Sequence, residues 1–145
     1  MNFFDALHIS SSGLSAQRLR MNVIASNLAN INTTRTAEGG PYRRKDVVFA
    51  ARPVSKSFQG MLKSQMLGRL CEVKVIGIID DPRPPCSKYD PQHPDADENG
   101  YVSLPNINLI EEMINMISAT RSYEANVAAI NATKKMALKA MEIGR

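Results

Sequence analysis

Proline and glycine are concentrated in the middle of this chain, and that distribution limits what it can fold into. All eight prolines lie between Pro41 and Pro105. Residues 106–143 contain neither proline nor glycine, and residues 1–35 contain one glycine and no proline. Proline interrupts a helix because it removes a hydrogen-bond donor and clashes with the preceding turn. The two ends are therefore predicted to be helical, and the middle irregular or β.

The apolar residues of the two ends recur with helical spacing. Near the N-terminus, an apolar residue recurs every seven positions in a column formed by Leu7, Leu14, Met21 and Leu28. Near the C-terminus, a mostly apolar series steps by three and four through Leu109, Met113, Met116, Thr120, Tyr123, Val127, Ile130, Lys134, Ala137 and Met141. A second row widens this apolar face at Ile110, Ile114 and Ile117. The spacing predicts helices over 3–30 and 107–143, each with a seam suited to packing against another helix.

The middle of the chain has the composition of β-structure. Residues 46–50 and 72–76 are rich in β-branched side chains, which predicts two strands. Residues 81–94 contain five prolines, so we expect an extended loop with little ladder bonding there. A Gly-Gly-Pro turn at 39–41 separates the first helix from the strands. The prediction is an α+β chain with three parts: a helix and the start of a linker (1–35), a β-rich domain (36–105) and a C-terminal coiled-coil helix (106–145).

Few residues point to chemistry. Residues 95–100 place oxygen-bearing side chains before a glycine, as in the first half of an EF-hand calcium loop, but Asn106 stands where the closing glutamate should be. The two histidines and two cysteines lack the spacing of a zinc site. The sequence has no Gly-x-Ser-x-Gly nucleophile motif and no phosphate-binding glycine loop. We therefore expect no enzyme activity, no bound metal and no cofactor.

Residues 38–69 carry seven basic side chains and two acidic ones. Nucleic-acid binding would need aromatic side chains interleaved for stacking, and Tyr42, Phe49 and Phe58 are too sparse for that. The favoured interpretation is a solvated basic face, or one matched to an acidic neighbour in an assembly. The alternative is a non-enzymatic module that binds a polyanion or a cell-wall polymer through residues 38–69.

The two predicted helices carry more apolar surface than one partner covers. Long uncovered apolar faces are typical of partner binding, and a heterologous contact between identical subunits builds an open helical assembly. Several asparagines interrupt these segments, and polar residues in helical interfaces fix register at a cost in stability. The candidate subunit-interface residues are Leu7, Leu14, Met21, Leu28, Leu109, Met113, Met116, Tyr123, Val127, Ile130, Ala137 and Met141. Because an isolated helix is marginally stable, we expect assembly to bury them.

Motifs at both ends identify a resemblance. Residues 12–18, 27–30 and 33–36 resemble the N-terminal signature of bacterial flagellar basal-body rod and hook proteins. Proximal-rod members of that family are similar over residues 38–45, 89–97, 100–102, 105–108, 121–126 and 139–145. The resemblance covers nearly the whole chain in order and is weakest over 52–74, where Cys71 stands in place of an expected glycine.

This resemblance implies a structural subunit of the proximal rod. Such subunits pair their two terminal helices as a coiled coil and polymerise through them into a hollow axial drive shaft, with the small β domain outside. The shaft transmits torque and carries export. The implied location is the periplasmic part of the basal body, reached by type III export without a cleaved signal peptide. The implied partners are other proximal and distal rod proteins, adaptor subunits at the membrane ring, copies of this chain and, in transit, the export apparatus. Neither nucleic acid nor a membrane span is implied.

Overall fold

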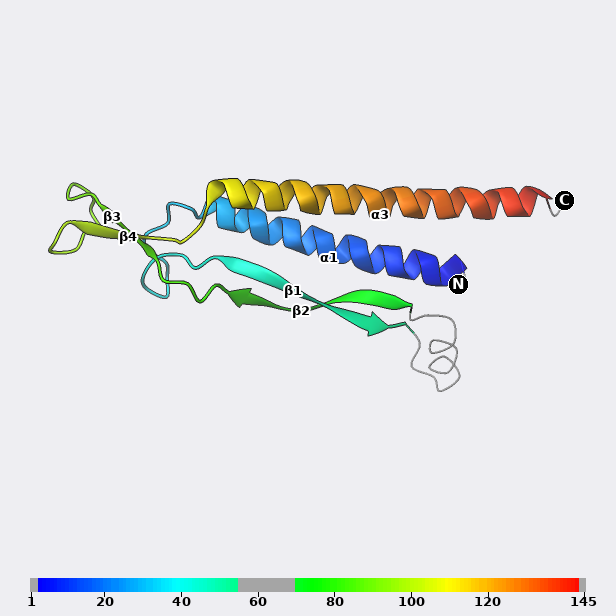
Figure 1. Cartoon of the computed structure of the whole chain (residues 1–145), viewed down its shortest axis with the longest axis horizontal. Helices are drawn as coiled ribbons and strands as arrows, with labels where there is room; N and C mark the ends of the chain where they lie inside the picture. Colours follow the sequence, from blue (N-terminus) through cyan, green and yellow to red (C-terminus); the bar gives the residue numbers. More distant parts are fainter. Residues whose placement is uncertain (1–2, 55–69, 144–145) are drawn as a thin grey trace.

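Two long helices dominate the structure. The computed structural model describes residues 3–54 and 70–143 of the chain. Helix α1 (Phe3–Ala29) and helix α3 (Leu109–Ile143) run antiparallel, side by side, and α3 continues beyond the first turn of α1 (Figure 1). Both helices begin and end within two residues of their predicted bounds. Together with the strands between them, they confirm the predicted α+β class.

The first two strands form a ribbon along α1. Strands β1 (Lys45–Pro53) and β2 (Cys71–Asp80) are antiparallel, with Lys45 opposite Asp80 and a bulge between Val48 and Phe49. The ribbon lies on the side of α1 that faces away from α3, so α1 is the middle layer (Figure 1). Both strands include the predicted β segments and extend beyond them. A bulge increases local twist, which helps a two-stranded ribbon to follow a helix.

A second hairpin lies beyond the end of the helices where α1 finishes and α3 starts (Figure 1). Strand β3 (Cys86–Tyr89) pairs antiparallel with β4 (Tyr101–Leu104), and the rings of Tyr89 and Tyr101 meet edge to face at 5.3 Å. The prediction of a loop with little ladder bonding over 81–94 was therefore wrong for β3. The prolines of that segment flank β3 and leave four consecutive residues able to pair.

The buried interior is small and centred on α1. The residues of α1 that are buried are Gly13, Ala16, Val23, Ile24 and Asn27. The helices approach each other closely at Gly13, where an added Cβ would lie 3.1 Å from side-chain atoms of Asn126. On the ribbon side, the backbone N–H of Val73 donates to Ser12 Oγ at 3.1 Å. Small side chains thus let α1 pack closely against α3, while the ribbon covers part of its other side.

Candidate functional site

The ends of the two helices are fixed at one place by local hydrogen bonds. At the end of α1, the carbonyl of Ser26 accepts both the backbone N–H of Asn30 at 3.1 Å and Asn30 Nδ2 at 2.9 Å, so the Asn30 side chain reinforces the last helical hydrogen bond. At the start of α3, Asn108 Oδ1 accepts from the N–H of Ile110 at 3.0 Å and acts as an N-cap. The chain therefore leaves α1 and enters α3 with defined geometry, and the buried polar residues Asn27 and Glu112 lie within about one turn of these two helix ends.

Asn27 is fully buried and uses all of its hydrogen-bonding capacity. Its Oδ1 accepts from the backbone N–H of Lys45 at 2.9 Å and from the hydroxyl of Tyr42 at 3.2 Å. Its Nδ2 donates to the carbonyl of Lys45 at 2.8 Å and to Glu112 Oε2 at 3.1 Å. An amide side chain has two donor hydrogens and two acceptor lone pairs, so every group is paired. Asn27 thereby connects α1 to both β1 and α3.

Glu112 is the fully buried acid of α3 and pairs with Arg44. Its Oε1 accepts from Arg44 Nε at 2.9 Å, and the Arg44 side chain is 14% exposed. Arg44 also lies within 3.4 Å of Asp46 and 3.8 Å of Asp81. Burial opposes the charge on Arg44, but hydrogen bonding and attraction to Glu112 and then to Asp46 together outweigh it and raise the pKa of Arg44 above its usual value. We call Asn27, Arg44 and Glu112 the polar cluster.

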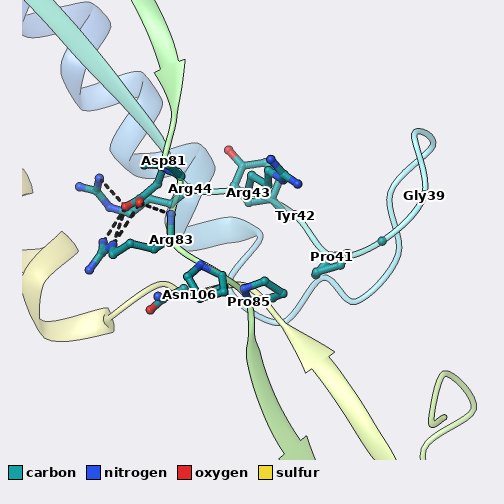
Figure 2. Close-up of a pocket in the computed structure, with 12 residues that line it drawn as sticks. Gly39, Pro41, Tyr42, Arg43, Arg44, Asp81, Arg83, Pro85 and Asn106 are labelled. Carbon is teal, nitrogen blue, oxygen red and sulfur yellow. Dashed lines mark hydrogen bonds and ion pairs between the residues drawn. The ribbon is translucent and has the colours of Figure 1, made fainter. Parts of the chain in front are cut away.

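The polar cluster continues outward through Asp81 and Arg83 to a surface groove. Figure 2 shows the guanidinium groups of Arg44 and Arg83 converging on the Asp81 carboxylate, beside a wall that includes Pro41, Pro85 and Asn106. Arg83 Nη2 donates to Asp81 Oδ2 at 2.6 Å and Arg83 Nε at 2.9 Å. Chiefly through this side-chain hydrogen bonding, Arg83 lowers the pKa of Asp81 to about 2.

The basic segment 38–69 is not a uniformly solvated face. Arg44, expected to be solvated there, is enclosed and paired with Glu112, so that part of the expectation was wrong. Arg52 Nε lies 4.0 Å from Glu72. Three further basic residues of the segment, Lys56, Lys63 and Arg69, and the aromatic Phe58 fall outside the described residues. Arg44 is therefore engaged in an internal ion pair and is not part of a solvated basic face.

The position of Glu112 in the helical repeat could have predicted that it is buried. Glu112 immediately precedes Met113 of the predicted apolar series. Shifting that series by one position aligns Glu112 with Ala119 and Asn126, which lie seven and fourteen residues later on the same side of α3. Glu112 and Ala119 are the fully buried residues of α3, and Asn126 meets α1 at Gly13. An acid on a helix face that packs against another helix needs a buried cation as partner.

None of the twelve predicted subunit-interface residues is fully buried within this chain. Nine of them are half-buried, namely Leu7, Leu14, Met21, Leu28, Met116, Tyr123, Val127, Ile130 and Ala137. The exposed ones are Leu109, Met113 and Met141. Met21 lies at the edge of the helix contact, where its Sδ is 3.6 Å from Thr120 Oγ1. The contact between α1 and α3 leaves part of the surface of each of these side chains exposed. Their role between subunits stays a prediction.

A continuous apolar surface remains on the first turns of α3. Ile110, Ile114 and Ile117 are 67%, 61% and 55% exposed, and Leu109 and Met113 lie beside them. We call these five residues the apolar stripe. At the other end of α3, large apolar side chains are again exposed at Met136, Leu138, Met141 and Ile143. Among the described residues, no helix combines the length and apolarity needed to cross a membrane.

The acidic segment 95–100 forms a turn. The N–H of Gly100 donates to the carbonyl of Asp97 at 2.8 Å, and Thr34 Oγ1 donates to Asp95 Oδ2 at 2.8 Å, which ties this turn to the linker after α1. Within residues 3–54 and 70–143, no three His, Cys, Asp or Glu side chains gather as a metal site. Both cysteines are free thiols, Cys71 half-buried and Cys86 exposed. The segment acts here as a structural connection.

Comparison with known proteins assigns this architecture to a class. Residues 7–35, which cover most of α1, match the family model described as "Flagella basal body rod protein". Residues 98–143, from before β4 to the end of α3, match the model "Flagellar basal body rod FlgEFG protein C-terminal". Both terminal helices therefore have the sequence of flagellar rod proteins, and the fully buried Asn27 and Glu112 lie one within each match.

Full-length relatives define the class further. The chain is 46% identical to "Flagellar basal-body rod protein FlgC" of Borreliella burgdorferi, over 99% of this chain and 98% of the relative. It is 47% identical to the FlgC of Bacillus subtilis, over 100% of both chains. It is 40% identical to that of Salmonella typhimurium, over 100% of this chain and 98% of the relative. The chain belongs to the FlgC family of flagellar basal-body rod proteins, and it is a structural subunit of the rod.

Proposed function

We propose that this rod subunit polymerises through the exposed faces of its two terminal helices into a hollow axial shaft in the proximal rod. The observation that carries the proposal is the apolar stripe, because α1 packs on another side of α3 and leaves these residues exposed. Contiguous apolar surface of this kind marks a contact with another protein. A repeated contact between different faces of neighbouring subunits extends into a helical assembly.

The proposal includes where the shaft lies and what it contacts. The β-rich part, residues 36–105, faces outward from the shaft, which crosses the periplasm, transmits torque and carries exported subunits. The neighbours are other proximal and distal rod proteins, adaptor subunits at the membrane ring and copies of this chain. The chain reaches its place through the flagellar export apparatus without a cleaved signal peptide. The names of the relatives support the basal-body location.

The apolar stripe is large enough to contribute substantially to such a contact. Full burial of an isoleucine side chain stabilises by about 1.5–3 kcal/mol. Ile110, Ile114 and Ile117 are each more than half exposed. Covering their exposed surface would therefore contribute about 3–5 kcal/mol per subunit, before the entropy of association is subtracted. Repetition along a polymer adds this contribution at every subunit.

The test replaces the three isoleucines of the stripe by serine, as I110S/I114S/I117S. The matched control replaces three exposed isoleucines of β2 instead, as I76S/I78S/I79S. We expect the first variant to fold, as judged by circular dichroism, but to support neither swimming nor completed rods in electron micrographs of isolated basal bodies. The control should retain more of both. Wild-type rods and swimming in the first variant would contradict the proposal.

A further inference from the structure

We propose that the polar cluster sets the longitudinal register of α3 against α1, as a positioning device rather than a source of net stability. Asn27 contributes the amide from α1, Arg44 the cation that precedes β1, and Glu112 the carboxylate from α3. These residues are far apart in the sequence, and their side chains meet only when both helices and the start of the ribbon occupy their observed positions. The inference does not depend on rod assembly, because every contact lies within one chain.

Packing between the helices also favours the observed register. On α1 it is made by small or medium side chains such as Gly13 and Ala16, and on α3 by Ala119. Most of the larger apolar side chains of α3 lie only partly buried or exposed along its length. A shift of α3 by four residues, about one turn, puts Tyr123 or Asn115 at the enclosed position of Ala119, so the small-residue contact opposes a slip. The larger apolar side chains, which are only partly buried, constrain the register less.

The polar cluster distinguishes the registers sharply. A shift of four residues along α3 puts Met116 in place of Glu112, opposite Asn27 and Arg44. The Asn27 amide then loses its acceptor on α3, and the buried guanidinium loses its hydrogen-bonded carboxylate. Removing one partner of a buried ion pair is strongly unfavourable, whereas apolar replacement of all partners is often neutral. A single buried asparagine is known to fix helix register in coiled coils on the same principle.

The same side chains also fix the ribbon to the helices. Asn27 holds the backbone N–H and C=O of Lys45, the first residue of β1, and the backbone N–H of Asp81 donates to the carbonyl of Arg44 at 2.7 Å. A change in the register of α3 therefore alters the offset between the apolar stripe and the ribbon. Every subunit that carries an intact cluster presents these surfaces at the same offset.

The experiment measures register by disulfide formation in the dilute full-length chain, with Cys71 and Cys86 replaced by serine. One reporter pair, M21C with T120C, matches the observed contact. Two further pairs, M21C with M116C and M21C with E124C, report a slip of one turn in either direction. Each pair is placed in a chain with the native cluster and in a chain carrying N27L, R44M and E112L. Rates of disulfide formation under mild oxidation are compared, and circular dichroism monitors folding.

With the native cluster, we expect the M21C/T120C pair to close at least about tenfold faster than either slipped pair, a preference of about 1.4 kcal/mol. With the apolar triple substitution, the chain should stay helical while the preference for M21C/T120C falls to that set by packing alone. An undiminished preference in the triple variant overturns the proposal. So does loss of folding, because the cluster would then be needed for stability itself. The single variant E112Q, which keeps the side-chain shape, should give an intermediate preference, and an unchanged one counts against the proposal.

Discussion

Replacement of Asn27 by aspartate tests the polar cluster with a minimal change in shape. The substitution exchanges the donor Nδ2 for an oxygen and leaves the acceptor Oδ1 in place. The new oxygen faces Glu112 Oε2 and the carbonyl of Lys45, both of which are acceptors. Two attractive contacts therefore become repulsive inside a fully buried site. We expect this variant to be strongly destabilised although its volume is almost unchanged.

The magnitude follows from the hydrogen bonds that are lost. A hydrogen bond to a charged group contributes about 1.5–3 kcal/mol and one to a neutral carbonyl about 0.5–1.5 kcal/mol. Their sum is about 2–4.5 kcal/mol, and repulsion between two buried carboxylates adds to it. The expected loss in the free energy of unfolding is therefore about 3–5 kcal/mol, a large share of the 5–15 kcal/mol typical of a folded domain.

Urea unfolding followed by circular dichroism measures this loss at neutral pH. The matched control is Asn22→Asp, which makes the same substitution at an exposed position of α1 and should change the unfolding free energy by less than about 0.5 kcal/mol. At lower pH the introduced carboxyl can bind a proton and donate again, so the difference between Asn27→Asp and wild type should shrink. A loss below about 1 kcal/mol at neutral pH would refute the reasoning, because the buried amide would then not be needed as a donor.

Three further predictions follow from other contacts. Gly13→Val should destabilise the chain by about 1–3 kcal/mol in urea unfolding, because the valine side chain meets Asn126. Combination with Asn126→Ala should recover part of this loss, and additive effects of the two substitutions would contradict this explanation. Arg83→Ala should raise the pKa of Asp81, measured by NMR titration, from about 2 toward its ordinary value of 3.8. Because the folded-state pKa is lowered, the pairing stabilises the fold above pH 3.8 and is lost as the pH falls toward 2, so the variant should lose less stability than wild type over that interval. In the dilute monomer, backbone amide hydrogen exchange should be slowest near Asn27 and fastest in the last turns of α3, which extend beyond the start of α1. The reason is that buried polar contacts hold only the region near Asn27. Uniform protection along both helices would contradict this prediction.

The elements of the fold could be predicted because each depends on local physics. The absence of proline and the three-and-four spacing located both helices, and β-branched residues located the two strands of the ribbon. The hairpin of β3 and β4 was missed because the prolines around Cys86–Tyr89 suggested a loop, although they flank the strand without entering it. The number of prolines in a segment does not show whether a short stretch between them can still pair as a strand.

The buried polar contacts could not be predicted because they depend on which distant residues meet. Arg44 lies in a run of three basic residues, and Glu112 follows another acid at the start of a helix, so each has an ordinary local explanation as a surface charge. Only the antiparallel pairing of α1 with α3 brings the two side chains together across 68 positions of sequence. Charge alone does not tell a buried partner from a solvated one.

The apolar series predicted from the sequence is not the surface that is most buried within the chain. The heptad column that begins at Leu7 is only half-covered in the single chain, while the fully enclosed positions are mostly small or polar, as at Gly13 and Asn27. A contact made by small residues and one polar cluster orients two helices but buries little apolar area, and area is what drives association. The larger side chains remain available for a second contact. We propose that the helices are positioned by their polar face within one subunit and held by their apolar faces between subunits. If instead the apolar stripe made no contact between subunits, substituting its exposed isoleucines would leave assembly unaffected.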